Sequence, residues 1–247
     1  MKVWAHRGTN VEAYENTIEA FNKAVECNPY GIELDVRLCA SGEVIVFHDP
    51  TLWNQTRSFE VVSNISLSKI RKLLPYYVPT FDEFLEEFYN KSRFCVNTKG
   101  SKVRSVELES SIVKSLSGLD VSRYEFSSKD FLSLAKLYSL SDTKPEITLN
   151  LGNPKKLKLA HRFVKIDSVI ISNMFVRPRW GASEAEARSV MSEGIGTIRR
   201  LRRKGYNVRV ETVNNPIRAQ DLALMGANAI STDHVARILR KPIGCQS

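Results

Sequence analysis

The 247-residue sequence predicts an α/β fold of the (β/α)8 barrel type, formed by a single domain over residues 1–247. Short runs rich in β-branched and aromatic residues alternate with amphipathic segments along the whole chain, as in parallel strands joined by helices. No internal repeat or linker divides the sequence. Nine segments are predicted as strands: Val3–His6, Gly31–Val36, Val44–His48, Phe94–Thr98, Tyr124–Ser127, Glu146–Asn150, Ser168–Ser172, Val208–Thr212 and Ala229–Thr232.

Helix-start and helix-stop signals lie between most of these strands. Capping-box spacing satisfies the exposed amide groups of a first turn, proline suits a first helical position, and glycine suits a helix end. The signals are Asn16 with Glu19, Thr80 with Glu83, Ser183 with Glu186, Pro154, Pro216 and Gly226.

Nine strands are one more than a closed barrel uses. Only residues 39–43 separate the second and third strands, whereas a parallel crossover needs about a dozen residues or more. We therefore expect an antiparallel hairpin, in which a turn centred on Ala40 and Ser41 places His48 opposite Glu33. The long connection at 50–93, polar at first and helical from about Thr80, is expected to form a short cap over one rim of the barrel.

Composition limits the partners and the compartment. The formal net charge of +9 favours anionic partners. The densest basic run, within 199–204, has apolar residues at helical spacing, which favours a solvated helix face over a nucleic-acid or lipid contact. No apolar run reaches the roughly 20 residues of a membrane span, so neither a signal peptide nor stable membrane insertion is expected. The four cysteines, Cys27, Cys39, Cys95 and Cys245, show no paired spacing, which favours the reducing cytoplasm.

Polar clusters stand at the predicted carboxyl ends of the first three strands, which share one face of a barrel. They are His6-Arg7-Gly8, Glu15-Asn16-Thr17, Glu33 with Asp35, and His48-Asp49. Active sites of barrel enzymes are built on this face, so the sequence predicts that its chemistry lies here.

Glu33 and Asp35 are two residues apart on a strand, so their side chains point the same way. Two buried carboxylates repel each other unless a cation holds them, and Mg²⁺ or Ca²⁺ suits a set of oxygen ligands. The alternative is a pair bonded to neighbouring Arg or Lys side chains. If repulsion dominates without metal, Asp35→Asn should not lower the melting temperature of the metal-free protein.

The basic residues of these clusters suit phosphate chemistry. His6 and His48 are candidate general acid and base because imidazole titrates near neutral pH, although either is also compatible with a buried structural role. Arg7 suits a phosphate, with Gly8 permitting close backbone approach, and the alternative for Arg7 is a structural salt bridge.

Taken together, the motifs resemble the glycerophosphodiester phosphodiesterase family. The resemblance rests on AHRG at Ala5–Gly8, ENT at Glu15–Thr17, E-x-D at Glu33–Asp35, SGEVIVFHD at Ser41–Asp49, Lys99, TVN at Thr212–Asn214 and GANAISTD at Gly226–Asp233. It covers nearly the whole chain and is strongest in the first fifty residues.

The resemblance implies a metal-dependent TIM-type barrel that hydrolyses glycerophosphodiesters to glycerol 3-phosphate and an alcohol. It assigns the metal to Glu33 and Asp35, acid–base roles to His6 and His48, phosphate contacts to Arg7 and Lys99, and an orienting role to Glu15.

Two positions depart from the family pattern. Asn97 stands where the family usually has a metal-binding glutamate, and its amide oxygen remains a candidate ligand of lower charge. Glu211 stands where the family usually has tryptophan before Thr-Val-Asn. Three roles are open for Glu211: restoring the lost charge, contacting a cationic alcohol headgroup, or an ion pair with Arg209 on the same strand face or with another nearby base. The connection at 50–93 is also shorter than the family's usual insertion.

Three functions remain open at this point. The first is hydrolysis of a small-molecule glycerophosphodiester, with no nucleic-acid partner. The second is a lipid-directed, phospholipase D-like activity on the same barrel, and the third is a catalytically silent barrel that binds a phosphorylated ligand. Retention of both histidines with Arg7 and Lys99 favours turnover, because a pure binding site needs no acid–base pair.

Overall fold

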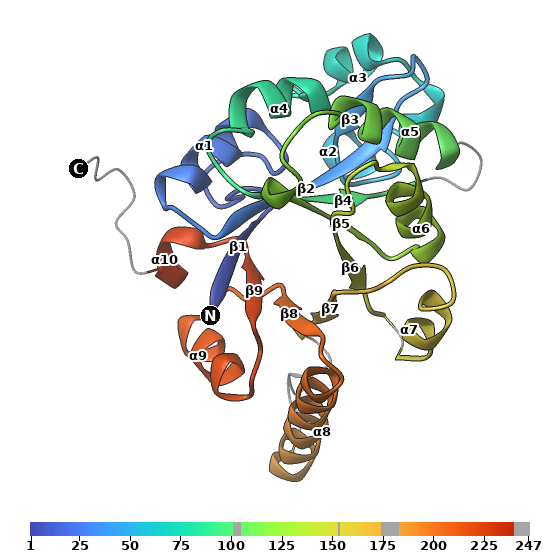
Figure 1. Ribbon diagram of the computed structural model, residues 1–247. Coiled ribbons are helices and arrows are strands. Elements are labelled where there is room, and N and C mark those ends of the chain that lie inside the picture. The colour runs from blue at the N-terminus through green and yellow to red at the C-terminus, as the bar shows by residue number, and fades with distance from the viewer. Residues whose placement is uncertain (101–104, 153, 174–182, 240–247) are drawn as a thin grey trace.

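The computed structural model describes residues 1–100, 105–152, 154–173 and 183–239. Eight parallel strands close into a barrel with helices outside, which confirms the predicted TIM-type architecture (Figure 1). The barrel strands are β1 (Lys2–His6), β2 (Gly31–Leu38), β4 (Phe94–Thr98), β5 (Tyr124–Ser128), β6 (Glu146–Asn150), β7 (Ser168–Ser172), β8 (Asn207–Glu211) and β9 (Ala229–Thr232). Pairing of β1 with β2 and with β9 closes the ring.

Helices cover the outside of the barrel and the long connection after β3. They are α1 (Ile18–Glu26), α2 (Trp53–Thr56), α3 (Leu67–Leu73), α4 (Phe81–Phe88), α5 (Ser105–Ser115), α6 (Phe131–Leu140), α7 (Pro154–Ala160), α8 (Glu184–Arg203), α9 (Pro216–Leu224) and α10 (Val235–Leu239), with 3-10 turns η1 (Val62–Asn64) and η2 (Val121–Arg123). Helix α3 lies in the part of the connection that the sequence pattern predicted as polar chain.

The ninth strand, β3 (Val44–Val46), forms the predicted antiparallel hairpin with β2, but its register differs by one residue. Val36 pairs with Val46, and the Phe47 amide donates to the Asp35 carbonyl oxygen, so His48 is not opposite Glu33 as predicted. The loop has three residues between Cys39 and Glu43, and it ends at Gly42 with φ of +99°. A glycine in the left-handed region is typical of three-residue hairpin loops, and the extra loop residue shifts the register.

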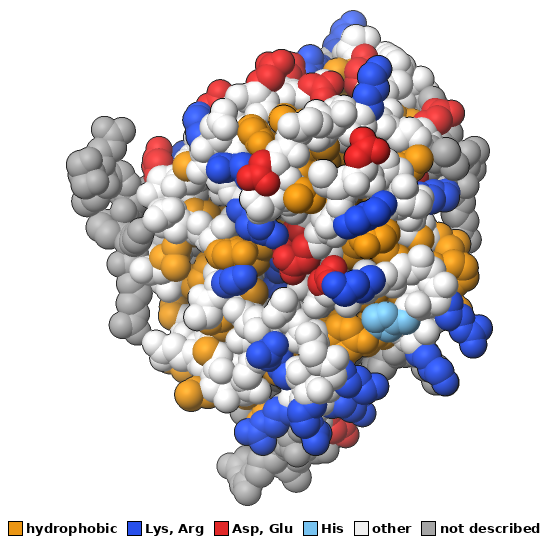
Figure 2. Space-filling view, viewed as in Figure 1, with side chains coloured by type: hydrophobic (Ala, Val, Ile, Leu, Met, Phe, Trp, Pro, Cys, Tyr) orange, Lys and Arg blue, Asp and Glu red, His pale blue; other side chains and the backbone are white. Residues whose placement is uncertain are grey.

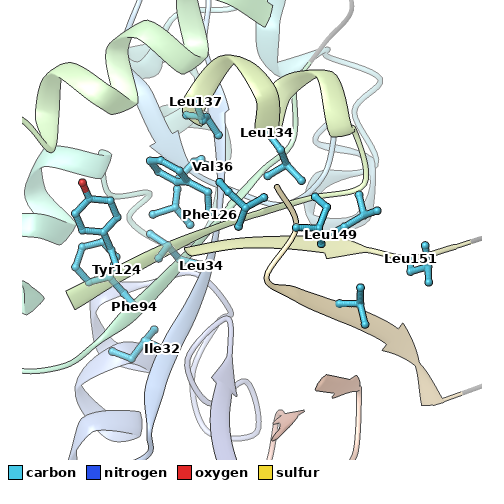
Figure 3. Close-up of a cluster of buried hydrophobic side chains, with 14 of the residues drawn as sticks. Ile32, Leu34, Val36, Phe94, Tyr124, Phe126, Leu134, Leu137, Leu149 and Leu151 are labelled. Atoms are coloured by element: carbon cyan, nitrogen blue, oxygen red, sulfur yellow. The ribbon is translucent and has the colours of Figure 1, made fainter. Parts of the chain in front are cut away.

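Most of the apolar core lies between the strands and the surrounding helices. Ile32, Leu34 and Val36 of β2 point outward, where they join aromatic and leucine side chains of β4, β5 and α6 (Figure 3). Because side chains alternate along a strand, Glu33 and Asp35 must then face the lumen. The outward apolar residues therefore place the two carboxylates inside the barrel.

The lumen is filled by polar side chains as well as apolar ones. Arg209 of β8 reaches Glu125 of β5 and lies over the Trp4 ring of β1, with its guanidinium carbon 4.0 Å from the ring centroid. All three side chains are buried. A buried arginine is tolerated here because a carboxylate and an aromatic face both compensate its charge.

The helix-start signals gave mixed results. Thr80 and Glu83 form the predicted capping box, and Pro154 and Pro216 begin their helices. Asn16 was wrongly predicted as a cap, because Thr17 caps α1 by accepting from the Ala20 amide. The Asn16 side chain is instead directed at β2 of the barrel.

The basic run predicted on a solvated helix face lies at the end of α8. Arg199, Arg200, Arg202, Arg203 and Lys204 are exposed, while Ile198 and Leu201 are buried against the barrel. Figure 2 shows basic side chains gathered over the region where Figure 1 places α8. Among the described residues, no helix is long and apolar enough to cross a membrane.

The connection at 50–93 has a small core of its own beneath the β2–β3 hairpin. Leu52, Ile65 and Ile70 pack with Ile45 and Phe47 of the hairpin arm. This second cluster holds the segment that follows His48 against the barrel.

Gly8 follows the end of β1 and lies close to α1. Its φ is +85°, and an added Cβ would lie 2.7 Å from the Ala20 carbonyl carbon of α1. Gly8 therefore permits close packing of α1, and its proposed role beside a phosphate stays a prediction. We expect Gly8→Ala to lower the free energy of unfolding by about 3 kcal/mol or more, from backbone strain plus overpacking.

Gly42→Ala is the matched control, because Gly42 has φ of +99° and nothing within 4 Å of an added Cβ. It should cost only the strain of about 1–2 kcal/mol. Urea unfolding of the two variants measures the difference, and equal losses would exclude the proposed steric contact with α1.

Candidate active site

The carboxyl ends of β1, β2 and β4 bring together the residues that the sequence singled out. His6 ends β1, Glu33 and Asp35 lie in β2, and Asn97 lies in β4. The register aligns His6 with Glu33, and Asp35 with Asn97. Three neighbouring strands thus present histidine, carboxylate and amide groups at the same end of the lumen.

Asp35 is the most highly connected of these residues. One carboxylate oxygen lies 3.1 Å from Lys99 Nζ, and the other lies 2.9 Å from Arg7 Nε. The Asn16 amide nitrogen donates to the second oxygen at 3.2 Å, and the Asn16 amide oxygen accepts from the Asp35 backbone at 3.1 Å. Burial alone would raise the pKa of Asp35, but Lys99 and Arg7 outweigh it and hold that pKa below its usual range.

Glu33 has a different environment on the same strand face. Its two oxygens accept from the Asn97 side-chain amide at 2.9 Å and from the Arg7 backbone amide at 3.1 Å. Burial and the neighbouring charge of Asp35 raise the pKa of Glu33 above its ordinary value. Ionisation of Glu33 therefore costs more free energy than ionisation of Asp35.

His6 is held by a carboxylate from the other end of the sequence. Its Nδ1 lies 2.7 Å from Asp233 Oδ1, and Asn214 donates to the other oxygen of Asp233 at 2.8 Å. Burial of the imidazole opposes protonation, but the bond to Asp233 and the charge of Glu33 outweigh it and raise the pKa of His6 to about 9. His6 is therefore protonated at neutral pH.

His48 is held in a similar way but with the opposite electrostatic result. Its Nδ1 lies 2.7 Å from Asp49 Oδ1, and Asn54 and Gln55 donate to the other oxygen of Asp49. Burial lowers the pKa of His48, with Arg7 and Lys99 acting in the same direction. His48 is therefore neutral at pH 7, so the two histidines are in opposite protonation states.

Arg7 lies between two acidic side chains. Its guanidinium donates to both oxygens of Glu15, at 2.9 and 3.0 Å, and also contacts Asp35. These two hydrogen bonds hold the Arg7 guanidinium in place.

Residue-based reasoning overlooked two groups that position this site. Arg37 donates to the carbonyl oxygens of His48, at 2.7 Å, and Lys99, at 2.9 Å, and so joins the hairpin to the end of β4. Asp233 was quoted only within a motif and received no role. Neither has a local signal, because both act through partners distant in the sequence.

Glu211 ends β8 on the lumen side. It accepts a hydrogen bond from the Asn150 side chain of β6 at 2.9 Å, which crosses over β7. The alternative of an ion pair with Arg209 is wrong, because Arg209 pairs with Glu125. In the described part of the chain Glu211 forms no ion pair.

The site offers a small set of oxygen ligands for a divalent cation. Within the described residues, no group of three or more His, Cys, Asp or Glu side chains is arranged to hold a metal ion. Glu33, Asp35 and the Asn97 amide nevertheless share one buried location and offer oxygen ligands. Asp35 Oδ1 is buried and accepts no hydrogen bond, being held only by the Lys99 charge. These oxygens fit a hard cation, with fewer anionic ligands than a site with three carboxylates.

Comparison with known proteins identifies the family. The model of the glycerophosphoryl diester phosphodiesterase family matches residues 6–237. The chain belongs to this family. It is 33% identical over 154 residues to a glycerophosphodiester phosphodiesterase of Caldanaerobacter subterraneus, an alignment covering 58% of this chain and 61% of that protein. It is 27% identical over 265 residues to the putative glycerophosphodiester phosphodiesterase YhdW of Bacillus subtilis, covering 97% of each.

Solved structures of the family share the fold. An Oleispira antarctica phosphodiesterase, solved in complex with the product sn-glycerol-3-phosphate, has a TM-score of 0.78 at 19% identity and covers 97% of this chain and 96% of its own. The glycerophosphodiester phosphodiesterase of Thermotoga maritima has a TM-score of 0.76 at 21% identity, with 97% of both chains covered. These similarities support the barrel fold. The members of the family are phosphoric diester hydrolases.

The different environments of Asp35 and Glu33 give a prediction about stability in chelator at pH 7. Asp35→Asn should lower the free energy of unfolding by about 3–5 kcal/mol, because it leaves Arg7 and Lys99 without their shared counter-charge. Repulsion between Glu33 and Asp35 alone had predicted the opposite, that Asp35→Asn would not destabilise the metal-free protein. Glu33→Gln is the matched variant, and it should cost less than about 1 kcal/mol because it removes a charge that the fold disfavours. Equal losses in urea unfolding would contradict the assignment.

Proposed function

We propose that the protein hydrolyses a glycerophosphodiester to glycerol 3-phosphate and an alcohol, by acid–base catalysis with His6 and His48. One observation carries the proposal: two imidazoles, each bonded through Nδ1 to a carboxylate at 2.7 Å, lie beside Arg7 and Lys99. A general base that activates water and a general acid that protonates the departing alcohol together speed this replacement at phosphorus.

The protonation states support specific roles. Neutral His48 takes a proton from the attacking water, and protonated His6 gives a proton to the oxygen of the departing alcohol. Asp49 and Asp233 fix the orientation of the rings through Nδ1, which leaves Nε2 of each ring for the reaction. After one turnover His6 is neutral and His48 is protonated, so proton exchange with solvent restores the starting state.

Arg7 and Lys99 supply positive charge for the phosphate. Both are partly buried and both already contact Asp35, so their positions are fixed before substrate binds. Glu15 keeps Arg7 in place through its two hydrogen bonds. Glu211 is proposed to contact the substrate from the facing side of the lumen.

Glu33, Asp35 and the Asn97 amide oxygen would hold the divalent cation on which enzymes of this family generally depend, with Mg²⁺ or Ca²⁺ suited to these ligands. When bound, such an ion supplies Lewis-acid stabilisation of the charge on the phosphoryl oxygens. Lys99 already contacts Asp35 Oδ1, and the Asn97 amide nitrogen already donates to Glu33, so a bound ion would compete with these two contacts.

A lipid-directed reaction is the second candidate, favoured by one observation near His48. Trp53 of α2 stacks on Phe59 with ring centroids 4.4 Å apart, and Phe59 is 77% exposed. Trp53 adjoins Asn54, which contacts Asp49. Cleavage of an acyl-bearing lysophospholipid, assayed against its deacylated form, separates the two candidates.

The substrate class and the cellular compartment complete the proposal. The substrate is a small molecule, with no role for nucleic acid, and the buried thiols of Cys27, Cys39 and Cys95 are compatible with a reducing cytoplasm.

The acid–base assignment predicts a difference between two histidine variants. His6→Ala and His48→Ala should each lower kcat on glycerophosphodiesters by about 10²- to 10⁴-fold, the usual range for a general acid or base. A p-nitrophenyl diester should restore kcat in His6→Ala, because its leaving group departs without a proton, but not in His48→Ala. Restoration of His48→Ala instead would exchange the two roles, and loss of folding in both would return them to structural histidines.

The metal assignment predicts weak binding. EDTA should abolish hydrolysis, and Mg²⁺ or Ca²⁺ should restore it. Asn97→Glu should raise the affinity of the site for the cation by adding ligand charge. Calorimetric titration of Asn97→Glu, Glu211→Gln and the double variant isolates any coupling between these positions. We expect additive effects, because β4 and β8 are four strands apart in either direction round the barrel. Full activity in chelator, from protein that contains no metal, would refute the assignment.

A further inference from the structure

Glu211 has an unusual charge environment. Asp35 has Arg7 and Lys99 as cationic partners and Asp233 has His6, whereas Glu33 is held by amide donors. Glu211 is partly buried, receives a hydrogen bond from Asn150, and forms no ion pair among the described residues. A partly desolvated carboxylate without a counter-charge favours a cation brought by a ligand.

The location of Glu211 indicates which ligand can bring that cation. In the strand order, β8 lies four positions from β4, so Glu211 faces the wall that carries Asn97 and Lys99. The phosphate is proposed to bind that facing wall. A substrate group that extends from the phosphate across the lumen is therefore directed towards the wall that carries Glu211.

Asn150 fixes the direction of the carboxylate. Its amide donates to Glu211 Oε1 at 2.9 Å, while no hydrogen bond or ion pair of the described residues engages Oε2. Asn150 is buried at the end of β6, so it cannot easily turn away. The arrangement is a carboxylate oriented by a neutral donor, with acceptor capacity remaining.

We propose that Glu211 selects substrates whose departing alcohol carries a positive charge, a protonated amine or a quaternary ammonium. The inference rests on the proposed hydrolysis, and it adds the residue that discriminates between alcohols. The phosphate is recognised by Arg7 and Lys99, and the cation two carbons away by Glu211. One substrate molecule then satisfies the charges of both walls of the lumen.

The test compares two glycerophosphodiesters that differ in one group. The ethanolamine ester carries an ammonium where the ethylene glycol ester carries a hydroxyl. Wild-type kcat/KM should favour the ethanolamine ester, and Glu211→Gln should lower the ratio of the two values about tenfold, as expected for loss of one charge-assisted contact. The preference should also weaken with added salt. Glu86→Gln, exposed on α4, is the control for a change of one negative charge.

Two results would overturn the inference. One is a Glu211→Gln variant that lowers kcat/KM for both esters by the same factor. The other is a variant that weakens inhibition by glycerol 3-phosphate to the same extent as it weakens use of the ethanolamine ester, because Glu211 would then contact the glycerol half. Glu211→Asp, which keeps the charge, should retain more of the preference than Glu211→Gln.

Failure of the proposed hydrolysis is distinguishable from failure of this inference. If neither ester is cleaved, the proposed function is wrong, and calorimetric binding of the two uncleaved esters still decides the role of Glu211. Tighter binding of the ethanolamine ester that disappears in Glu211→Gln supports the inference, and equal binding of both esters refutes it.

Discussion

The arrangement of the site depends on one buried carboxylate, that of Asp35. It lies on the lumen face of β2 because Ile32, Leu34 and Val36 pack outward, and burial without partners would neutralise it. Arg7 and Lys99 prevent this from two different segments of the chain. The ion pairs that make the Asp35 charge tolerable in the lumen therefore also hold the two cations of the proposed phosphate site.

The histidines show how tertiary partners decide chemistry. Identical side chains acquire opposite protonation states, although each bonds a carboxylate at 2.7 Å. Burial lowers the pKa of both rings, but at His6 the bond to Asp233 and the charge of Glu33 outweigh it, whereas at His48 Arg7 and Lys99 add to the effect of burial. Their roles follow from position relative to the β2 carboxylates and the two basic side chains, and residue type alone leaves the roles undetermined.

Much of the fold and part of the site could be predicted from the sequence, for physical reasons. Period-two and helical patterns are local, and they located the barrel strands and the face on which Glu33 and Asp35 lie. The hairpin register was wrong by one residue because it depends on the left-handed backbone of Gly42. Asn16 was assigned to a helix cap because asparagine suits a cap as well as it suits a hydrogen bond to Asp35. The role of Asp233 depends on a contact with His6 across 227 positions, for which one sequence has no local signal.

The two departures from the family pattern can be understood as one redistribution of charge. Asn97 removes an anion from the wall that carries Glu33 and Asp35, and there it donates to Glu33 rather than adding to the repulsion. Glu211 adds an anion to the facing wall, beyond the reach of Arg209, which Glu125 engages. Negative charge is thus lower where a metal would bind and higher where an alcohol would extend. The proposed weak binding of a divalent ion and the proposed preference for a cationic substrate would both follow from the same pair of substitutions.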